Sequence, residues 1–352
     1  MINTKPFEHY GIDTTKNLGI KTVCPRPFDT LLIDKYGQAY ACECTAWLPA
    51  AVGNVQVNSI EEILNSDKLR QVQGTVQDGT YRLCNNKQCT YIISNWFDSN
   101  KAITNLRLGI DDSCNLSCPS CRNQKIFVSK GPVLRRKMLW VDKIVAWIQQ
   151  QDHNIKVHIG SDGDPFASLV YRYFMKRMTE LNLSNVSFAF QTNGLLLKKL
   201  HPRTKYIFDH LYKLNISIDG ATKATYEKLR RGGSWEKILE NFAFISSIKK
   251  FPVHLHMVVQ KDNWHEIPAL LELSNKFNFD MVYLNEIQDW ATNVNYKEQK
   301  QTFESTDYKQ LIAGLQNNPQ VNYFNFVLNA YKSVCQRHCD VQLHSVFRLW
   351  PN

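Results

Sequence analysis

Short apolar stretches alternate with longer amphipathic segments through the middle of the chain. The short stretches are rich in β-branched and aromatic residues, as strands are, and they lie at 106–110, 157–160, 186–191, 215–220, 254–260 and 280–284. The longer segments repeat apolar residues at three-to-four spacing, as helices do, in Leu134, Met138, Val141, Ile144, Val145 and Ile148 and in Ile267, Leu270, Leu271 and Phe277. This alternation predicts an α/β fold with six βα units around a parallel sheet.

A different pattern precedes these units. Two short apolar runs, 31–33 and 39–44, flank a turn that contains Gly37, which predicts a β-hairpin with Cys24 and Cys42 at the same end. Ser59 followed by Glu62 predicts the start of a helix. After the βα units, Tyr308, Ile312 and Leu315 predict one more helix. We therefore expect a small cysteine-rich module at 1–100, an α/β domain at 101–300 and a helical extension at 301–352.

Composition and charge limit the kinds of partner and the cellular compartment that the chain is expected to have. The 352 residues include 42 Lys and Arg against 32 Asp and Glu, a net charge of +10, which suits an anionic partner or an acidic substrate. No basic stripe interleaved with aromatic residues stands out, so general solubility is favoured over nucleic-acid binding. Neither a signal-peptide core nor an apolar run of membrane-spanning length is present. These features predict a cytoplasmic protein whose ten cysteines are metal ligands rather than disulfides.

Three cysteines, Cys114, Cys118 and Cys121, follow the apolar stretch 106–110 after a break at 111–113. This places them on a loop at the carboxyl end of a strand, where α/β barrels carry their chemistry. Three thiolates can bind three irons of a cubane cluster and leave the fourth iron open, whereas most iron–sulfur proteins supply four. A zinc site would need a fourth Cys or His, and none follows Cys121 closely. Three buried or zinc-bound cysteines remain the alternative.

The spacing C-x3-C-x2-C is similar to the cluster loop of the radical S-adenosylmethionine (SAM) superfamily. That resemblance implies a partial (β/α)6 barrel of the TIM type and a 4Fe–4S cluster whose open iron is chelated by the amino and carboxylate groups of SAM. It also implies that one electron cleaves the sulfonium, and that the 5′-deoxyadenosyl radical takes a hydrogen atom from a substrate. Ser120 departs from the family, which usually has an aromatic residue before the last cysteine.

The same resemblance implies a set of SAM-binding residues near the ends of later strands. Asp162-Gly163-Asp164-Pro165 stands where the family has a G-G-E-P loop, so Asp164 is expected to pair with the SAM ammonium. Arg230 is expected to grip the SAM carboxylate, with Arg231 as the neighbouring alternative. The full expected set is Gly163, Asp164, Asn193, Ser217, Asp219, Arg230 and Gln260, with Asn263 beside the last. An ordinary βα turn at 162–165 and a surface charge at Arg230 remain alternatives.

The N-terminal block 24–89 is similar to the SPASM and twitch extensions of radical SAM enzymes. Gly37 to Cys42 matches G-x4-C, and Gly53-Asn54-Val55 before the expected helix matches the connecting segment, although the extension normally follows the barrel. The resemblance implies an auxiliary 4Fe–4S cluster held by Cys24, Cys42, Cys84 and Cys89, with Cys44 as a possible replacement. A zinc knuckle is the alternative, because four thiolates suit either metal.

Two further cysteines, Cys335 and Cys339, allow three interpretations: ligands of a second auxiliary cluster with Cys44, a thiol that returns a hydrogen atom to a substrate radical, or structural residues. The family members that the chain most resembles modify peptides or proteins, so a peptide or protein substrate is expected. The rival functions are radical SAM modification of a small molecule and a zinc-stabilised basic protein that binds RNA. The enzyme would also need an electron donor such as flavodoxin or ferredoxin, and no membrane partner is expected.

Overall fold

A computed structural model describes residues 15–21, 23–85, 89, 92, 104–160, 162–287, 296–315 and 317–324. Its centre is a ten-stranded sheet with the strand order β10-β9-β8-β7-β6-β5-β4-β1-β2-β3. The strands are β1 Thr30–Ile33, β2 Gln38–Tyr40, β3 Ala51–Asn54, β4 Asn105–Leu108, β5 Ile155–Ile159, β6 Val186–Thr192, β7 Leu211–Ser217, β8 Val253–Val259, β9 Met281–Glu286 and β10 Val321–Phe324.

The six predicted strands are β4 to β9, and each pairs in parallel with the next. The expected α/β partial barrel is therefore confirmed. The sheet continues beyond it at both edges, since β1 pairs in parallel with β4 and β10 pairs in parallel with β9. The pairings of β1 with β4 and of β10 with β9 were not predicted, because β1 and β10 have four residues each and so short a hydrophobic pattern does not identify the neighbouring strand.

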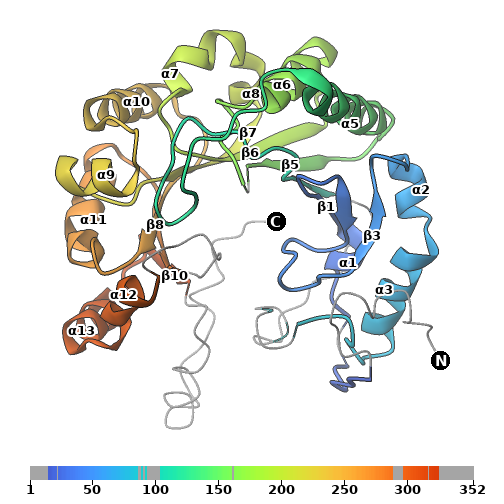
Figure 1. Cartoon of the computed structure of the whole chain (residues 1–352), viewed down its shortest axis with the longest axis horizontal. Helices are drawn as coiled ribbons and strands as arrows, with labels where there is room; N and C mark the ends of the chain where they lie inside the picture. The colour runs from blue at the N-terminus through green and yellow to red at the C-terminus, as the bar shows by residue number, and fades with distance from the viewer. Residues whose placement is uncertain are drawn as a thin grey trace.

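Helices cover the convex face of the curved sheet (Figure 1). They are α5 Gly131–Gln149, α6 Leu169–Leu181, α7 Leu197–Leu200, α8 Lys205–Asp209, α9 Lys223–Leu229, α10 Trp235–Ile248 and α11 Ile267–Lys276, with single 3₁₀ turns at His201–Arg203 and Trp264–Glu266. The expected helices at 134–148 and 267–277 are α5 and α11. Ser168, Thr222 and Ser234 cap three of the helices by accepting a backbone N–H in the first turn.

The N-terminal module, at one end of the crescent, contains the expected hairpin, in which β1 and β2 pair antiparallel. Gly37 closes the turn with φ +78°, a conformation that favours glycine. The helices are α1 Arg26–Asp29, α2 Ile60–Leu64 and α3 Asp67–Gln77. Helix α2 begins with the expected capping box, in which Ser59 and Glu62 each accept the other's backbone N–H.

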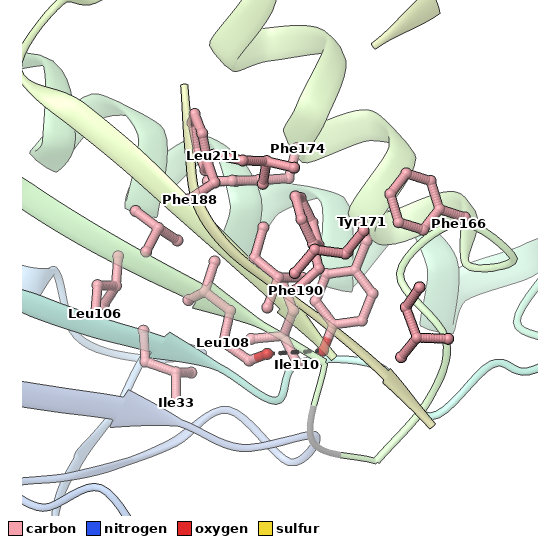
Figure 2. Packing of buried hydrophobic residues seen from close by; sticks show 14 of the residues in the cluster. Ile33, Leu106, Leu108, Ile110, Phe166, Tyr171, Phe174, Phe188, Phe190 and Leu211 are labelled. Atoms are coloured by element: carbon pink, nitrogen blue, oxygen red, sulfur yellow. Dashed lines mark hydrogen bonds between the residues drawn. The ribbon is translucent and has the colours of Figure 1, made fainter. Parts of the chain in front are cut away.

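The module and the barrel share one hydrophobic core. Figure 2 shows Ile33 of the module beside Leu106 and Leu108 of β4, with Phe188 and Phe190 farther along the same cluster. The hydroxyl of Tyr171, on α6, donates to the carbonyl of Leu108 at 3.0 Å. Because β1 also hydrogen-bonds along the edge of β4, the module is joined to the strand that leads into the cluster loop.

The two faces of the barrel sheet differ in polarity. One row across the strands contains the buried Leu108, Ile159 and Phe190, which lie on the face under the helices. The adjacent row contains the half-buried Arg107 and His158, which lie on the opposite, inner face. The concave side of the barrel is therefore lined by polar side chains.

The C-terminal part of the described chain holds α12 Tyr296–Lys300, a 3₁₀ turn at Gln301–Glu304 and α13 Thr306–Leu315. The last of these is the helix expected around Tyr308, and both helices lie beside β10 at the far end of the crescent (Figure 1). The cysteines Cys335 and Cys339 lie outside the described residues. No helix in the described segments is long and apolar enough to cross a membrane.

Candidate iron–sulfur and SAM site

The three cysteines of the predicted cluster loop follow β4 directly. Backbone pairing between Cys114 and Ile126 closes the loop, and the carbonyl of Cys118 accepts the N–H groups of Cys121 and Arg122, both at 2.9 Å. Cys118 is buried, Cys114 is half-buried and Cys121 is exposed. The loop thus sits at the carboxyl end of the strand, as the sequence predicts.

Two arginines contact these thiols. Arg122 Nε lies 3.3 Å from Cys121 Sγ, and its other nitrogens donate to the carbonyls of Asp112 and Asp162. Arg230 Nη1 lies 3.9 Å from Cys118 Sγ. Burial raises the pKa of Cys118, and the charge of Arg230 opposes that shift. The Arg230 guanidinium thus favours the thiolate form of Cys118, which is the form that binds iron.

The loop after β5 packs tightly against the start of the cluster loop. A Cβ atom on Gly163 would lie 2.6 Å from the carbonyl oxygen of Ser113 and 2.8 Å from that of Asp111. The N–H of Asp164 donates to the same Ser113 carbonyl at 2.9 Å. Glycine is therefore required at 163 for the two loops to touch.

The carboxylate of Asp164 is buried and accepts four hydrogen bonds. One oxygen accepts from the N–H groups of Phe166 and Ala167, and the other from Thr192 Oγ1 at 2.7 Å and Asn193 N at 2.8 Å. These donors match the roughly four acceptor positions of a carboxylate. Burial is the main cause that raises the Asp164 pKa. The expected pairing of Asp164 with a SAM ammonium stays a prediction, and the observed partners make this residue a link between the loops after β5 and β6.

Asn193 brings the end of β6 to the cluster loop. Its side-chain nitrogen donates to Asn115 Oδ1 at 2.9 Å and lies 3.8 Å from Cys114 Sγ. Burial and, next, the negative charge of Asp164 raise the pKa of Cys114 to about 11. The structure therefore gathers Gly163, Asp164 and Asn193 beside Cys114.

A second group of expected residues gathers beside Cys118. Asp219 is buried and forms an ion pair with Arg230, with 2.9 Å between Asp219 Oδ2 and Arg230 Nε. Arg231 contacts Ser117 instead of a thiol: its Nε donates to Ser117 Oγ at 3.2 Å, and its backbone carbonyl accepts a hydrogen bond from Ser117 N. Of the two arginines, Arg230 is the one that reaches a cluster thiol. Ser217, farther down β7, accepts a hydrogen bond from Gln191.

Gln260 lines a cavity next to the cluster loop. The cavity has a volume of about 280 Å³ and is lined by Pro119, Ser120, Asn123, Lys228, Leu229, Arg231, Gln260, Asp262, Ile287, Tyr296 and Gln299. Its wall thus combines the cluster loop, the end of α9, the ends of β8 and β9, and α12. Asn263 does not line it and instead donates to the backbone carbonyls of Asp219 and Val258.

The N-terminal module holds a second gathering of thiols. Cys24, Cys42, Cys84 and Cys89 line one small cavity with apolar neighbours that include Trp47, Leu48, Val76 and Tyr81. Burial raises the pKa of Cys24 to about 12, and the charge of Cys89 adds to it. The charges of Cys24, Cys89 and Cys84 likewise add to the effect of burial on Cys42. Thiols spread around a cavity wall suit a cluster in which each binds a separate iron.

Cys44, the possible replacement ligand, does not line this cavity. After burial, its pKa is affected by the backbone N–H groups of Ala46 and Trp47 and by the charges of Arg107 and Glu43, none of which is a module thiol. The Cys44 side chain therefore lies beside Arg107 and Glu43, while its backbone N–H contacts the thiol of Cys42. Within the described segments, no three His, Cys, Asp or Glu side chains gather around a point that would hold a single metal ion.

Sequence reasoning missed three supporting residues. Arg122 directly follows the last cluster cysteine, and that adjacency was the available signal. Lys137 is buried and forms an ion pair with the buried Asp111 at 2.9 Å. The sequence feature that could have identified it is a charged residue on the face of α5 that also carries Trp140 and Val141. Glu43 forms ion pairs with Arg26 at 3.2 Å and with Arg107 at 3.7 Å, and no local sequence pattern predicts these contacts.

Comparison with known proteins agrees with this geometry. The sequence model of the Radical SAM superfamily matches residues 110–274, and that of the SPASM iron–sulfur cluster-binding domain matches residues 24–90. GTP 3′,8-cyclase from Alkaliphilus metalliredigens is 30% identical over 165 residues, 45% of this chain and 48% of that protein. GTP 3′,8-cyclase from Aliarcobacter butzleri is 26% identical over 213 residues, 59% of this chain and 62% of that protein.

Among solved structures, SuiB from Streptococcus suis bound to its precursor peptide SuiA has a TM-score of 0.50 at 12% identity, over 83% of this chain and 61% of that one. The likeness shows a shared fold. The chain spans about half to just over six tenths of the length of these curated relatives and of SuiB.

A partial barrel with three thiols at the end of its first strand, next to a four-thiol module, defines an iron–sulfur protein of the SAM-dependent radical class. The chain belongs to the radical SAM superfamily and carries a SPASM-type iron–sulfur domain ahead of the barrel. Both resemblances seen in the sequence are thereby confirmed, including the unusual order. The cofactors of such a protein are a SAM-binding 4Fe–4S cluster, SAM itself and auxiliary iron–sulfur clusters.

Proposed function

We propose that this chain cleaves SAM reductively at a 4Fe–4S cluster held by Cys114, Cys118 and Cys121, and uses the 5′-deoxyadenosyl radical to take a hydrogen atom from a substrate. The observation that carries the proposal is the placement of these thiols at the carboxyl end of β4, with Arg122 and Arg230 against two of the sulfurs. When bound, the cluster supplies one electron and an open iron for SAM.

The surrounding residues fit two supporting roles. Arg230 is held by Asp219, so its guanidinium is fixed beside the cluster loop in a position suited to a carboxylate. Gly163, Asp164 and Asn193 hold the loops after β5 and β6 against the cluster loop. The cavity between Ser120 and Gln260 offers space for the rest of the SAM molecule, and Ser217 lies farther down the inner face.

The module is proposed to hold one auxiliary 4Fe–4S cluster through Cys24, Cys42, Cys84 and Cys89. The support is their shared cavity, together with the match to an iron–sulfur-binding domain. Cys44 is left out of this ligand set, because it lies against Arg107 and Glu43 instead. The electron for SAM cleavage would come from an external one-electron donor such as flavodoxin or ferredoxin.

Two substrate classes are proposed. A peptide or protein is the first, on the resemblance of the module to the extensions of peptide-modifying enzymes. A small molecule is the second, and it is favoured by the relatives named GTP 3′,8-cyclase, which act on a nucleotide.

The proposal is tested by anaerobic reconstitution with iron and sulfide, addition of dithionite and SAM, and measurement of 5′-deoxyadenosine. Wild-type protein is expected to form it, and Cys118→Ala is expected to lose at least 100-fold of the rate, because an iron of the cluster would lack its thiolate. Cys44→Ala is the matched control and is expected to keep the activity. Absence of 5′-deoxyadenosine from the wild type, or its persistence in Cys118→Ala, would contradict the mechanism.

A further inference from the structure

Arg122, the residue after the last cluster cysteine, joins three stretches of chain through its guanidinium. Its Nε lies 3.3 Å from Cys121 Sγ, its Nη1 donates to the carbonyl of Asp112 at 2.5 Å, and its Nη2 donates to the carbonyl of Asp162. The residue is only 9% exposed. Because the planar fork of an arginine can serve several acceptors at once, these contacts fix the guanidinium against the Cys121 sulfur.

The charge of Arg122 is not neutralised by a carboxylate. Asp112 and Asp162 offer it their backbone carbonyls, and the Asp112 carboxylate lies 3.7 Å from Lys35 Nζ instead. In the segments that the structure describes, no carboxylate oxygen lies within 4.0 Å of an Arg122 nitrogen. A buried charge is costly unless an opposite charge lies beside it. The arrangement therefore suits an anionic group held at Cys121.

The other arginine that reaches a cluster thiol differs in this respect. Arg230 Nε lies 2.9 Å from Asp219 Oδ2, so a carboxylate offsets its charge, and its Nη1 lies 3.9 Å from Cys118 Sγ. Arg122 lies closer to its thiol and has no such partner. Burial raises the pKa of Cys114 to about 11, and the charge of Arg122 acts against that shift. The charge of Arg122 thus acts on two of the three thiols.

A fixed positive charge beside an iron–sulfur cluster affects its reduction potential. That potential depends on the net charge of the cluster, on hydrogen bonds to its sulfurs and on its exposure to solvent. Reduction transfers one electron from the external donor to the cluster, with no bond formed or broken. A cation held at a ligand sulfur therefore stabilises the reduced state more than the oxidised state, because its attraction grows with the added negative charge. Burial strengthens the effect, since a buried charge is screened less by water and salt.

We propose that Arg122 is a positioning residue whose charge, held against Cys121, stabilises the reduced cluster of the SAM site and raises its reduction potential. This assignment rests on the proposed function and names the residue that makes the cluster reducible by the external donor. The carbonyls of Asp112 and Asp162 keep the guanidinium in place. The loops after β4 and β5 thereby take part in setting the potential.

The test is a redox titration of the reconstituted protein, followed by electron paramagnetic resonance in the absence of SAM. The signal that is missing from Cys118→Ala is assigned to the cluster of this loop, which separates it from the auxiliary cluster. Arg122→Gln removes the charge and keeps a polar side chain. It is expected to make reduction at least about tenfold less favourable, which for one electron is a midpoint potential about 59 mV lower.

Two further variants separate the charge from other effects. Arg122→Lys keeps the charge but cannot serve all three acceptors, and its reduction equilibrium is expected to stay within about threefold of the wild type. Lys125→Gln removes an exposed cation from the same loop. It is expected to change the equilibrium by less than about twofold, because water screens a surface charge. Iron and sulfide analysis measures how much cluster each variant holds.

The proposal is overturned if Arg122→Gln has the wild-type midpoint, because the charge would then have no effect on reduction. An equal loss in Arg122→Gln and Arg122→Lys also overturns it, since the charge is present in the second variant. A loss as large in Lys125→Gln would show that the general surface charge sets the potential, which is a third contradiction.

The lysine variant decides the case in which Arg122→Gln assembles no cluster. Both variants lose the fork that joins the two carbonyls, so assembly in Arg122→Lys with a midpoint near that of the wild type supports the role of the charge. Failure of both to assemble a cluster shows a purely structural role and overturns the proposal. Because the midpoint is read without SAM, a wild type that forms no 5′-deoxyadenosine contradicts the proposed function and leaves the test of Arg122 intact.

Discussion

At the scale of single residues, the site depends on side chains that bring loops together as much as on the thiols. Gly163 has no room for a side chain because the backbone of Asp111 and Ser113 lies against it. Asp164 then fastens the same loop to the end of β6 through Thr192 and Asn193. The cluster loop is therefore positioned by its neighbours, and small changes beside it should disturb iron binding.

Gly163→Ala is expected to reduce the iron retained by the cluster loop, because the added methyl group would displace the backbone around Ser113. Iron analysis and electron paramagnetic resonance after dithionite reduction would measure the loss, expected to be at least half of the SAM-site cluster. Gly314→Ala is the matched control, since a Cβ there meets nothing within 4 Å. Full cluster content in Gly163→Ala would show that the loops can adjust.

The thiols of the cluster loop could be predicted from the sequence because their spacing is local, and those of the module because the block 24–89 resembles a known extension. Their electrostatic partners could not, because the pairs Asp219–Arg230 and Glu43–Arg107 join residues that only the fold brings together. The role of Asp164 shows the same limit. Its position in the loop was evident from the sequence, but only two of its four donors, Phe166 and Ala167, belong to that loop, and the other two, Thr192 and Asn193, come from the end of β6.

At the scale of elements, α5 is held against β4 by a buried ion pair. Lys137 projects from α5 to Asp111, directly after β4, and Ser168 at the start of α6 donates to the other carboxylate oxygen at 2.7 Å. Burying two charges is costly unless they are paired and hydrogen-bonded, as they are here. The pair thus ties two helices to the strand that leads into the cluster loop.

Lys137→Met is expected to lower the free energy of unfolding by about 3–5 kcal/mol, since it leaves the Asp111 carboxylate buried without a counter-charge. Urea unfolding followed by circular dichroism would measure it. The double variant Lys137→Met with Asp111→Asn removes both charges and is expected to recover part of the loss. Equal stability of Lys137→Met and the wild type would mean that the pair contributes nothing.

Most elements of the barrel were predictable because their apolar periodicity is long and regular. The strands β4 to β9 and the helices α5 and α11 follow directly from that pattern. Two strand pairings did not follow from it, since β10 has only four residues and nothing in the sequence of β1 indicates that it pairs with β4 as well as with β2. Pairing between distant segments is decided by packing and carries little local signal.

At the scale of the whole molecule, the module and the barrel are continuous. Their strands belong to one sheet, and their apolar side chains belong to one buried cluster that reaches from Leu31 to Ile312. Lys143 of α5 also donates to the carbonyls of Val55 and Asn58 in the module. These contacts make independent unfolding of the two parts unfavourable.

The metal-free chain is therefore expected to unfold in a single cooperative transition. In differential scanning calorimetry, the calorimetric and van't Hoff enthalpies should agree within about 10%, the criterion for two-state behaviour. A calorimetric enthalpy about twice the van't Hoff enthalpy, or two separated peaks, would show instead that the module and the barrel unfold as separate units.

The backbone ladder between β1 and β4 has a consequence for how the two proposed iron sites work together. Because β1 and β4 pair in one sheet, the backbone ladder helps to set the spacing between them. An electron exchanged between them would therefore cross a distance fixed by hydrogen-bonded strands. The far end of the crescent is held in the same way, since β10 pairs with β9 and Tyr308 and Ile312 of α13 belong to the shared core.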